Sequence, residues 1–217
     1  MIIEGQLSIL FGGAAILVSF LSLGKLRLRQ LARYYGLASF FLACAIFVSG
    51  ESGEGNSMFL TALATAVIKG ALIPLLFYYV SRRAHLNERL LSSVRPAMSY
   101  FLSALVIGLA LFSAVAAGPI FGEVSVEGLF EAFSFLFLGF VMVVLRRDLV
   151  SQIVGFLIFE NGVSFLIVIT MGDVPFVAEL GILVTVLVSA YLMSLLSLRL
   201  KGLYAVEDTD ALREFVE

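Results

Sequence analysis

The chain has 217 residues, of which 61% are hydrophobic and 14% are charged, and its formal net charge is −2. Soluble domains carry about 25% charged residues and about 45–50% apolar ones. This composition excludes a soluble globular domain, and the small net charge gives no bulk attraction to nucleic acid. We therefore expect an integral membrane protein in contact with the lipid bilayer.

The chain has few residues that could bind a metal ion or a cofactor. It has one cysteine, Cys44, in an apolar run and one histidine, His85, in a polar connector. Disulfides, iron–sulfur clusters and zinc sites need several such ligands, and haem between spans needs axial ligands inside helices. No phosphate-binding loop, nucleophile–base pair or metal-ligand spacing is present. We expect no cofactor, no metal and no catalytic site in this chain.

Seven apolar runs predict the architecture. Barrel strands would show a two-residue alternation over about ten residues, which these runs lack, and helices are the other structure that spans a bilayer. The predicted fold is all-α and polytopic, with about seven transmembrane helices. The first run follows a terminus without the basic segment of a cleaved signal peptide, so we expect it to be retained. The runs cover residues 5–23, 34–50, 58–80, 97–117, 126–145, 150–171 and 175–198.

Basic residues predict the orientation of these helices. Of the 14 lysines and arginines, all but Lys69 fall in every second connector or in the C-terminal tail. The positive-inside rule then places the N-terminus outside and the C-terminus in the cytoplasm. The residues that carry this pattern are Lys25, Arg27, Arg29, Arg33, Arg82, Arg83, Arg89, Arg95, Arg146, Arg147, Arg199, Lys201 and Arg213. Tyrosines near the cytoplasmic ends are expected to be interfacial anchors: Tyr34, Tyr35, Tyr78, Tyr79 and Tyr204.

Lys69 lies in the middle of the third run, where a charge costs about 2.5–3.5 kcal/mol on insertion scales. Ala62, Ala66 and Gly70 recur every four residues and form a small-residue stripe that allows close helix approach. Pro74 has no N–H, which frees the carbonyl of Gly70 and predicts a kink that exposes an acceptor or admits water beside Lys69. Lys69 is a candidate for an ion or proton pathway. A buried contact that locks helix packing, with an ordinary proline kink, is the alternative.

Glu160 lies about 15 Å into the sixth run, again near the centre of the bilayer. Asn161 and Gly162 follow it and extend a polar break in an apolar helix, and Ser164 is one turn further on the same face. Burial disfavours the charged form of a carboxylate, so Glu160 can carry a proton. It is the second pathway candidate, again with helix packing as the alternative.

Two more acidic residues are weaker candidates. Glu179 lies about four residues into the seventh run, where it is either an exit group near the outer face or a carboxylate favoured by the dipole of a helix N-terminus. Glu131 lies near the outer end of the fifth run, where the interface can solvate it. Both are candidates for the ion or proton pathway, Glu179 as its outward connection if the path leaves at the outer face.

The pattern resembles the hydrogenase-4 component E family, membrane subunits of nickel–iron hydrogenases of the formate hydrogenlyase type. The resemblance rests on Lys69 five residues before Pro74, on Glu160-Asn161-Gly162, and on Glu179-Leu180-Gly181-Ile182, in this order and at these depths. The length and the seven-span layout also fit, so the likeness covers essentially the whole chain.

The last three spans are similar to the K-type subunit of respiratory complex I and to the C subunit of Mrp-type antiporters. The similarity lies in Arg146-Arg147-Asp148-Leu149, Gly155 and Asn161. The glutamates of the K-type subunit align near Leu157 and Leu187, so the resemblance implies a shifted path with its own lysine.

The family resemblance implies a four-helix region over residues 1–120, a K-type-like three-helix region over 121–200 and a short acidic cytoplasmic tail over 201–217. It implies a non-catalytic subunit in the cytoplasmic membrane of a prokaryote, beside antiporter-like subunits. A peripheral redox arm would hold nickel–iron and iron–sulfur centres, and the membrane arm would couple redox chemistry to proton or sodium transfer.

Three other functions stay open at this point. The chain can be a subunit of an Mrp-type cation/proton antiporter without a redox arm, or a structural linker between larger membrane subunits. A stand-alone seven-span receptor or carrier is disfavoured by the short connectors and by the lack of an inverted repeat.

Overall fold

A computed structural model describes residues 2–50, 55–83, 95–122, 124–147 and 149–171, together with Tyr191. Within these residues all regular secondary structure is helical, and six helices are long and apolar enough to cross a membrane. This confirms the all-α prediction for the described part of the chain. The seventh predicted run, 175–198, lies outside the described residues except for Tyr191, so the count of seven stays a prediction. The elements are α1 (Ile2–Leu23), α2 (Leu28–Gly50), α3 (Gly55–Ala64), the π-helical segment η1 (Thr65–Leu72), α4 (Ile73–Arg83), α5 (Pro96–Phe121), α6 (Val126–Leu145) and α7 (Leu149–Met171).

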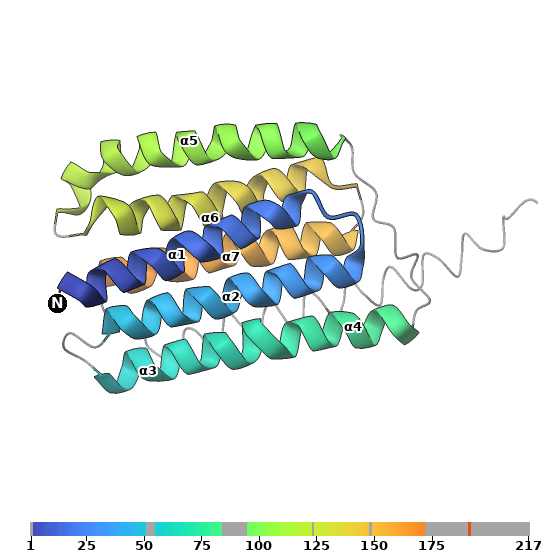
Figure 1. Ribbon diagram of the computed structural model, residues 1–217, viewed down its shortest axis with the longest axis horizontal. Coiled ribbons are helices and arrows are strands. Elements are labelled where there is room, and N and C mark those ends of the chain that lie inside the picture. The colour runs from blue at the N-terminus through green and yellow to red at the C-terminus, as the bar shows by residue number, and fades with distance from the viewer. Residues whose placement is uncertain are drawn as a thin grey trace, which may run out of the picture.

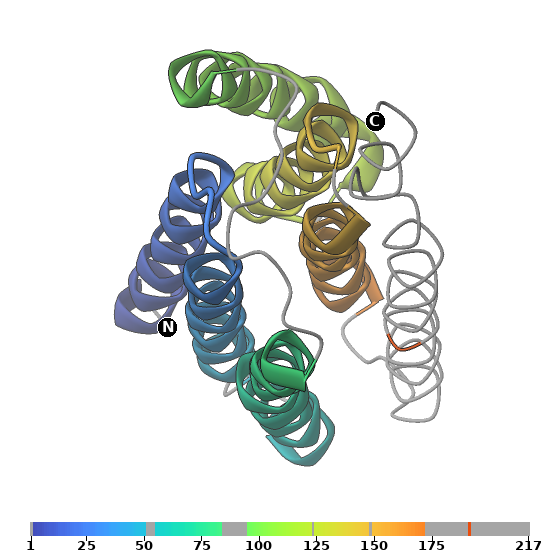
Figure 2. The ribbon, with the colours of Figure 1, turned by 90° about the vertical axis from the view of Figure 1, so that its right-hand side faces the viewer.

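The helices form a bundle in which α2, α6 and α7 are central. α3, η1 and α4 follow one another as a single long helix that packs on α2, whereas α5 packs on α6 at the opposite edge (Figure 1). Seen from one end, α2 lies between α1 and the α3–α4 helix, and α7 lies beside α6 (Figure 2). The share of the membrane span that is buried is 61% for α2 and 56% for α7 but 17% for α5. The interior of the bundle is therefore built around α2 and α7.

The basic connectors gather at one end of the bundle. The α1–α2 and α6–α7 connections lie at the same end as the last turn of α4 and the first turn of α5 (Figure 1). This is the clustering that the charge pattern predicts for the described connectors. Which end faces the cytoplasm stays a prediction from the positive-inside rule.

Helix α2 begins at Leu28, six residues before the run expected from hydropathy. Arg29 and Arg33 therefore lie in the first turns of a helix and not in a connector. The difference arises because an arginine can lay its aliphatic stem along apolar surface while its guanidinium reaches the interface.

Glycines bring α6 and α7 into backbone contact. A Cβ atom at Gly139 would lie 2.7 Å from the carbonyl oxygen of Gly155, and one at Gly155 would lie 2.9 Å from the amide nitrogen of Val143. Gly162 faces α6 in the same way, since a Cβ atom there would lie 2.7 Å from the amide nitrogen of Leu136. Close approach through small residues is how membrane helices gain packing energy. This contact fixes the height of α7, and hence of Glu160, against α6.

Arg146 has a different role from the solvated connector charge that the sequence indicated. Its side chain is buried, and Nη2 donates to the carbonyl oxygens of Leu23 at 2.7 Å and Lys25 at 2.6 Å. The Leu23 carbonyl is in the last turn of α1, which lacks intrahelical donors, and the Lys25 carbonyl belongs to the α1–α2 connector. Gln152 Nε2 donates in turn to the carbonyl of Arg146 at 2.8 Å. Arg146 thus ties the α1–α2 connector to the α6–α7 connector.

Candidate functional site

A π-helical segment carries Lys69. Over Thr65–Leu72 the helix widens, and the N–H of Ile73 bonds to the carbonyl of Ile68, five residues back. Pro74 follows directly, and because it has no N–H it cannot close the regular four-residue ladder. The sequence predicted a local kink here, and the structure has a π segment that turns Lys69 into the bundle. Such segments often occur at functional sites.

Lys69 and Glu160 form a buried ion pair. Lys69 Nζ donates to Glu160 Oε1 at 2.9 Å and lies 2.8 Å from Oε2. Ser164 completes the group, since its Oγ accepts from Lys69 Nζ at 3.1 Å and donates to Glu160 Oε1 at 2.7 Å. The side chains of Lys69 and Glu160 are 1% and 7% exposed. The three polar groups therefore bond to one another in an apolar interior, where Glu160 Oε2 is held by the charge of the ammonium.

The pair lies at mid-height in both helices. Lys69 is in the middle of the 20-residue span Phe59–Tyr78, and Glu160 is in the middle of the 20-residue span Ser151–Thr170. Each is about 15 Å from either end at the rise of an α-helix. Neither side chain can reach an interface from that depth, so the opposite charges compensate each other inside the protein.

Helix α2 is brought against η1 by two glycines. A Cβ atom at Gly36 would lie 2.8 Å from the carbonyl oxygen of Gly70 and 2.7 Å from Cγ of Pro74. Gly70 in turn faces the carbonyl of Gly36 and the side chain of Phe40. Gly70, which belongs to the predicted small-residue stripe, therefore packs on α2, and this close contact leaves the neighbouring Lys69 directed towards α7.

More polar groups of α2 lie near the pair. Asn161 Nδ2 donates to Ser39 Oγ at 3.1 Å. Tyr35, one turn before Ser39 on α2, is fully buried. The buried atoms without a hydrogen-bond partner among the described residues include Tyr35 Oη, Asn161 Oδ1 and Glu160 Oε2. The prediction that Tyr35 is an interfacial anchor is wrong, because the earlier start of α2 carries this residue two turns into the helix.

The expected polar break after Glu160 does not interrupt the helix. α7 is α-helical from Leu149 to Met171, through Asn161 and Gly162. Gly162 packs closely against α6, and the side-chain amide of Asn161 donates a hydrogen bond to Ser39 of α2. The polar residues of α7 are therefore accommodated by neighbouring helices, and its own backbone stays regular.

The other two predicted acidic residues are separate from the pair or outside the described residues. Glu131 is buried in α6, and its carboxylate lies against Gly12 of α1, where a Cβ atom would overlap it. The structure thus gives it a protein neighbour in place of the solvated interface that the sequence suggested. Glu179 lies outside the described residues.

The described residues hold no group of three or more histidine, cysteine, aspartate or glutamate side chains that could bind a metal ion. What the site offers is a lysine, a carboxylate and a hydroxyl linked at 2.7–3.1 Å. Such groups can exchange protons along their hydrogen bonds. The sequence indicated both Lys69 and Glu160 as candidates, but it could not show that they pair, because they are 91 positions apart. It also gave no indication that Tyr35 and Ser39 of α2 belong to this region.

Membrane-length helices around buried charges define a multi-pass membrane protein. The chain is 22% identical over 200 residues to hydrogenase-4 component E of Escherichia coli, covering 92% of this chain and 93% of that protein. The corresponding protein of Shigella flexneri matches to the same extent. An uncharacterized protein of Mycobacterium tuberculosis is 25% identical over 206 residues, covering 93% and 92% of the two chains. No family model matches the chain, and no solved structure matches it.

Proposed function

We propose that this chain is a non-catalytic integral membrane subunit of an ion-coupled redox complex of the membrane-bound hydrogenase or formate hydrogenlyase type. The complex transfers protons or sodium ions, Lys69 and Glu160 take part in its proton transfer, and the chain anchors neighbouring membrane subunits. The similarity to hydrogenase-4 component E along almost the whole chain supports the assignment to such a complex. The observation that carries a role in transfer is the ion pair at mid-membrane height.

The pair suits proton transfer because a change in the protonation of one residue alters the stability of the charge on the other. A proton that reaches Glu160 neutralises the carboxylate and leaves the Lys69 ammonium without its counter-charge in an apolar interior. That state favours release of a proton from Lys69 to the next acceptor, because an unpaired buried charge is costly. Ser164 bonds to both groups and keeps them in contact. The Lys69 ammonium lies 2.8–2.9 Å from both carboxylate oxygens of Glu160, where a sodium ion would have to bind. We therefore assign proton transfer to this pair and sodium transfer, if any, to other parts of the complex.

A structural linker is the second candidate, and one observation favours it. The ion pair joins η1 to α7, whereas the α3–α4 helix otherwise packs mainly on α2. On this account Lys69 and Glu160 hold the third span in place and conduct nothing. A subunit of an Mrp-type antiporter is the third candidate and would contain the same pair without a redox arm.

The identity of the partner subunits tests the proposal. The full chain, tagged and expressed in its own cells, is purified from mild detergent, and its partners are identified by mass spectrometry with a parallel assay for nickel and iron. We expect antiporter-like subunits and a metal-containing peripheral arm to co-purify. Antiporter subunits alone, without nickel or iron–sulfur proteins, would establish the antiporter in place of the redox complex.

A further inference from the structure

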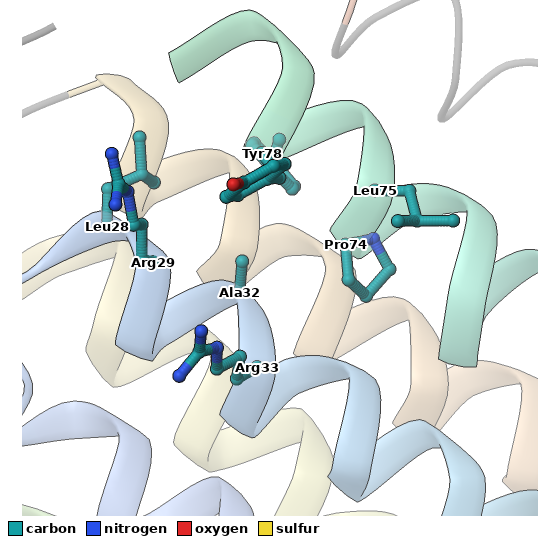
Figure 3. A pocket seen from close by; sticks show the side chains of 8 residues that line it. Leu28, Arg29, Ala32, Arg33, Pro74, Leu75 and Tyr78 are labelled. Carbon is teal, nitrogen blue, oxygen red and sulfur yellow. The ribbon is translucent and has the colours of Figure 1, made fainter. Parts of the chain in front are cut away.

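We propose that the groove between the first turns of α2 and the first two turns of α4 binds an anionic phospholipid, with its phosphate at Arg29 and Arg33. The groove has a volume of about 280 Å³ and is drawn in Figure 3. This proposal does not depend on the function of the Lys69–Glu160 pair. The lining residues are Leu28, Arg29, Ala32, Arg33, Pro74, Leu75, Phe77 and Tyr78.

The two walls of the groove differ in chemistry. Arg29 and Arg33 are four residues apart on α2, so both guanidinium groups rise from the same side of that helix. The facing wall on α4 is formed by Pro74, Leu75 and Tyr78 (Figure 3). Leu28 and Ala32 make the rest of the α2 wall apolar. The groove is therefore mainly apolar, as an acyl chain requires, and carries two guanidinium groups on its α2 side for a phosphate.

The depth of the groove matches the position of a lipid headgroup. Arg33 is five residues from the start of the span Leu28–Ser49, and Pro74 is four residues from the end of the span Phe59–Tyr78. At 1.5 Å per residue the groove therefore reaches about 6–8 Å into the membrane. This is the region of the upper acyl chains, and the stems of the two arginines allow their guanidinium groups to reach towards the phosphates above it. Leu75 is 63% exposed there, so lipid can reach it.

The charge of the surroundings selects an anionic lipid over a zwitterionic one. Leu28 and Arg29 of the groove directly follow the α1–α2 connector, and this connector lies at the end of the bundle where the described basic connectors gather (Figure 1). Basic pockets between spans on the cytoplasmic side bind anionic headgroups, and each basic residue near an anionic surface contributes a factor of about five. Arg29 also lies over the ring of Tyr78, with its guanidinium carbon 5.7 Å from the ring centre. This contact places positive charge at the boundary between the two helices.

The chain has no tryptophan, which permits a single-tryptophan test. The Leu75→Trp variant of the full chain is placed in nanodiscs with a phosphatidylcholine background. Either brominated phosphatidylglycerol or brominated phosphatidylcholine is added at the same mole fraction, and bromine quenching of tryptophan reports the lipid at the groove. We expect several-fold stronger association of the anionic lipid with this site. A Phe112→Trp reporter on α5, where Phe112 is 71% exposed, should show no preference.

Charge variants identify the residues responsible. In the Leu75→Trp background, Arg29→Gln and Arg33→Gln should each lower the preference about fivefold, whereas Arg33→Lys should retain most of it. Arg27→Gln removes a charge from an exposed connector residue outside the groove and should leave the preference unchanged. Equal quenching by both lipids at Leu75→Trp overturns the proposal. So does an equal loss in Arg27→Gln, which would indicate general surface charge. If a variant does not fold, the preference of the Leu75→Trp chain should still fall with added salt, and a salt-independent preference contradicts the phosphate contact.

Discussion

The carbonyl oxygen of Gly70 in η1 faces Gly36 of α2, and a Cβ atom at position 36 would lie 2.8 Å from it. This contact sets the distance between α2 and the helix that carries Lys69. The π segment, the proline and the two glycines therefore act together to present the lysine to α7.

A methyl group at position 36 should disturb this contact. Gly36→Ala must displace either a backbone carbonyl or the ring of Pro74, neither of which is a flexible side chain. Overpacking of this kind costs about 1–3 kcal/mol. We expect a lower midpoint of thermal unfolding for the purified chain in detergent. Gly13→Ala on α1 is the matched control, because a Cβ atom there has no neighbour within 4 Å. Equal stability of the two variants would show that α2 and η1 can separate freely.

Arg146 should matter for stability far more than its neighbours in the basic connectors. Arg146→Gln loses charge-assisted hydrogen bonds to the carbonyls of Leu23 and Lys25. Bonds to charged groups are worth about 1.5–3 kcal/mol each. Arg27→Gln changes an exposed residue of the α1–α2 connector and should lie within about 0.5 kcal/mol of the parent. The midpoints of thermal unfolding of both variants are compared. A decrease no larger for Arg146→Gln than for Arg27→Gln would contradict the role of Arg146 in joining the two connectors.

Removal of the Tyr35 hydroxyl should affect stability and proton transfer differently. The hydroxyl is buried without a hydrogen-bond partner among the described residues, so Tyr35→Phe should leave the free energy of unfolding unchanged or raise it by about 1 kcal/mol. Tyr35 is one turn from Ser39, which accepts a hydrogen bond from Asn161, the residue next to Glu160, so we expect loss of the hydroxyl to slow coupled proton transfer in the assembled complex. Unchanged transfer in a stable Tyr35→Phe complex would reduce Tyr35 to a packing residue.

Reporter fusions test the orientation. The alternation of basic and acidic connectors predicts an outside N-terminus and a cytoplasmic C-terminus. A reporter fused at the C-terminus should be cytoplasmic, and one inserted in the connector over residues 51–57 should be external. Finding both on the same side would require a different number or arrangement of spans.

Hydropathy was sufficient to locate the described spans. The predicted run 126–145 coincides with α6, and 150–171 differs from α7 by one residue. The start of α2 was missed because Arg29 and Arg33 look like connector residues when the aliphatic part of the side chain is ignored. Tyr35 was misplaced for the same reason.

The candidate site was predictable in part. Lys69 and Glu160 stand out in any apolar run, because the bilayer penalises charge. Their pairing depends on how α2 and α6 position the other two helices, which is tertiary information. The burial of Arg146 depends likewise on two connectors that meet only in the folded chain.

The most direct test of the central claim is ion transfer in the double variant Lys69→Met/Glu160→Gln. Removing both charges together avoids an unpaired buried charge, which would cost about 3–5 kcal/mol, so the complex should assemble. The assembled complex is reconstituted in proteoliposomes, and proton transfer is measured beside redox turnover. Glu127→Gln, which changes an exposed acidic residue at the start of α6, is the control. We predict normal redox turnover with loss of most coupled transfer in the double variant and full coupling in the control. Full coupling in an assembled double variant would contradict the account and leave Lys69 and Glu160 as packing contacts.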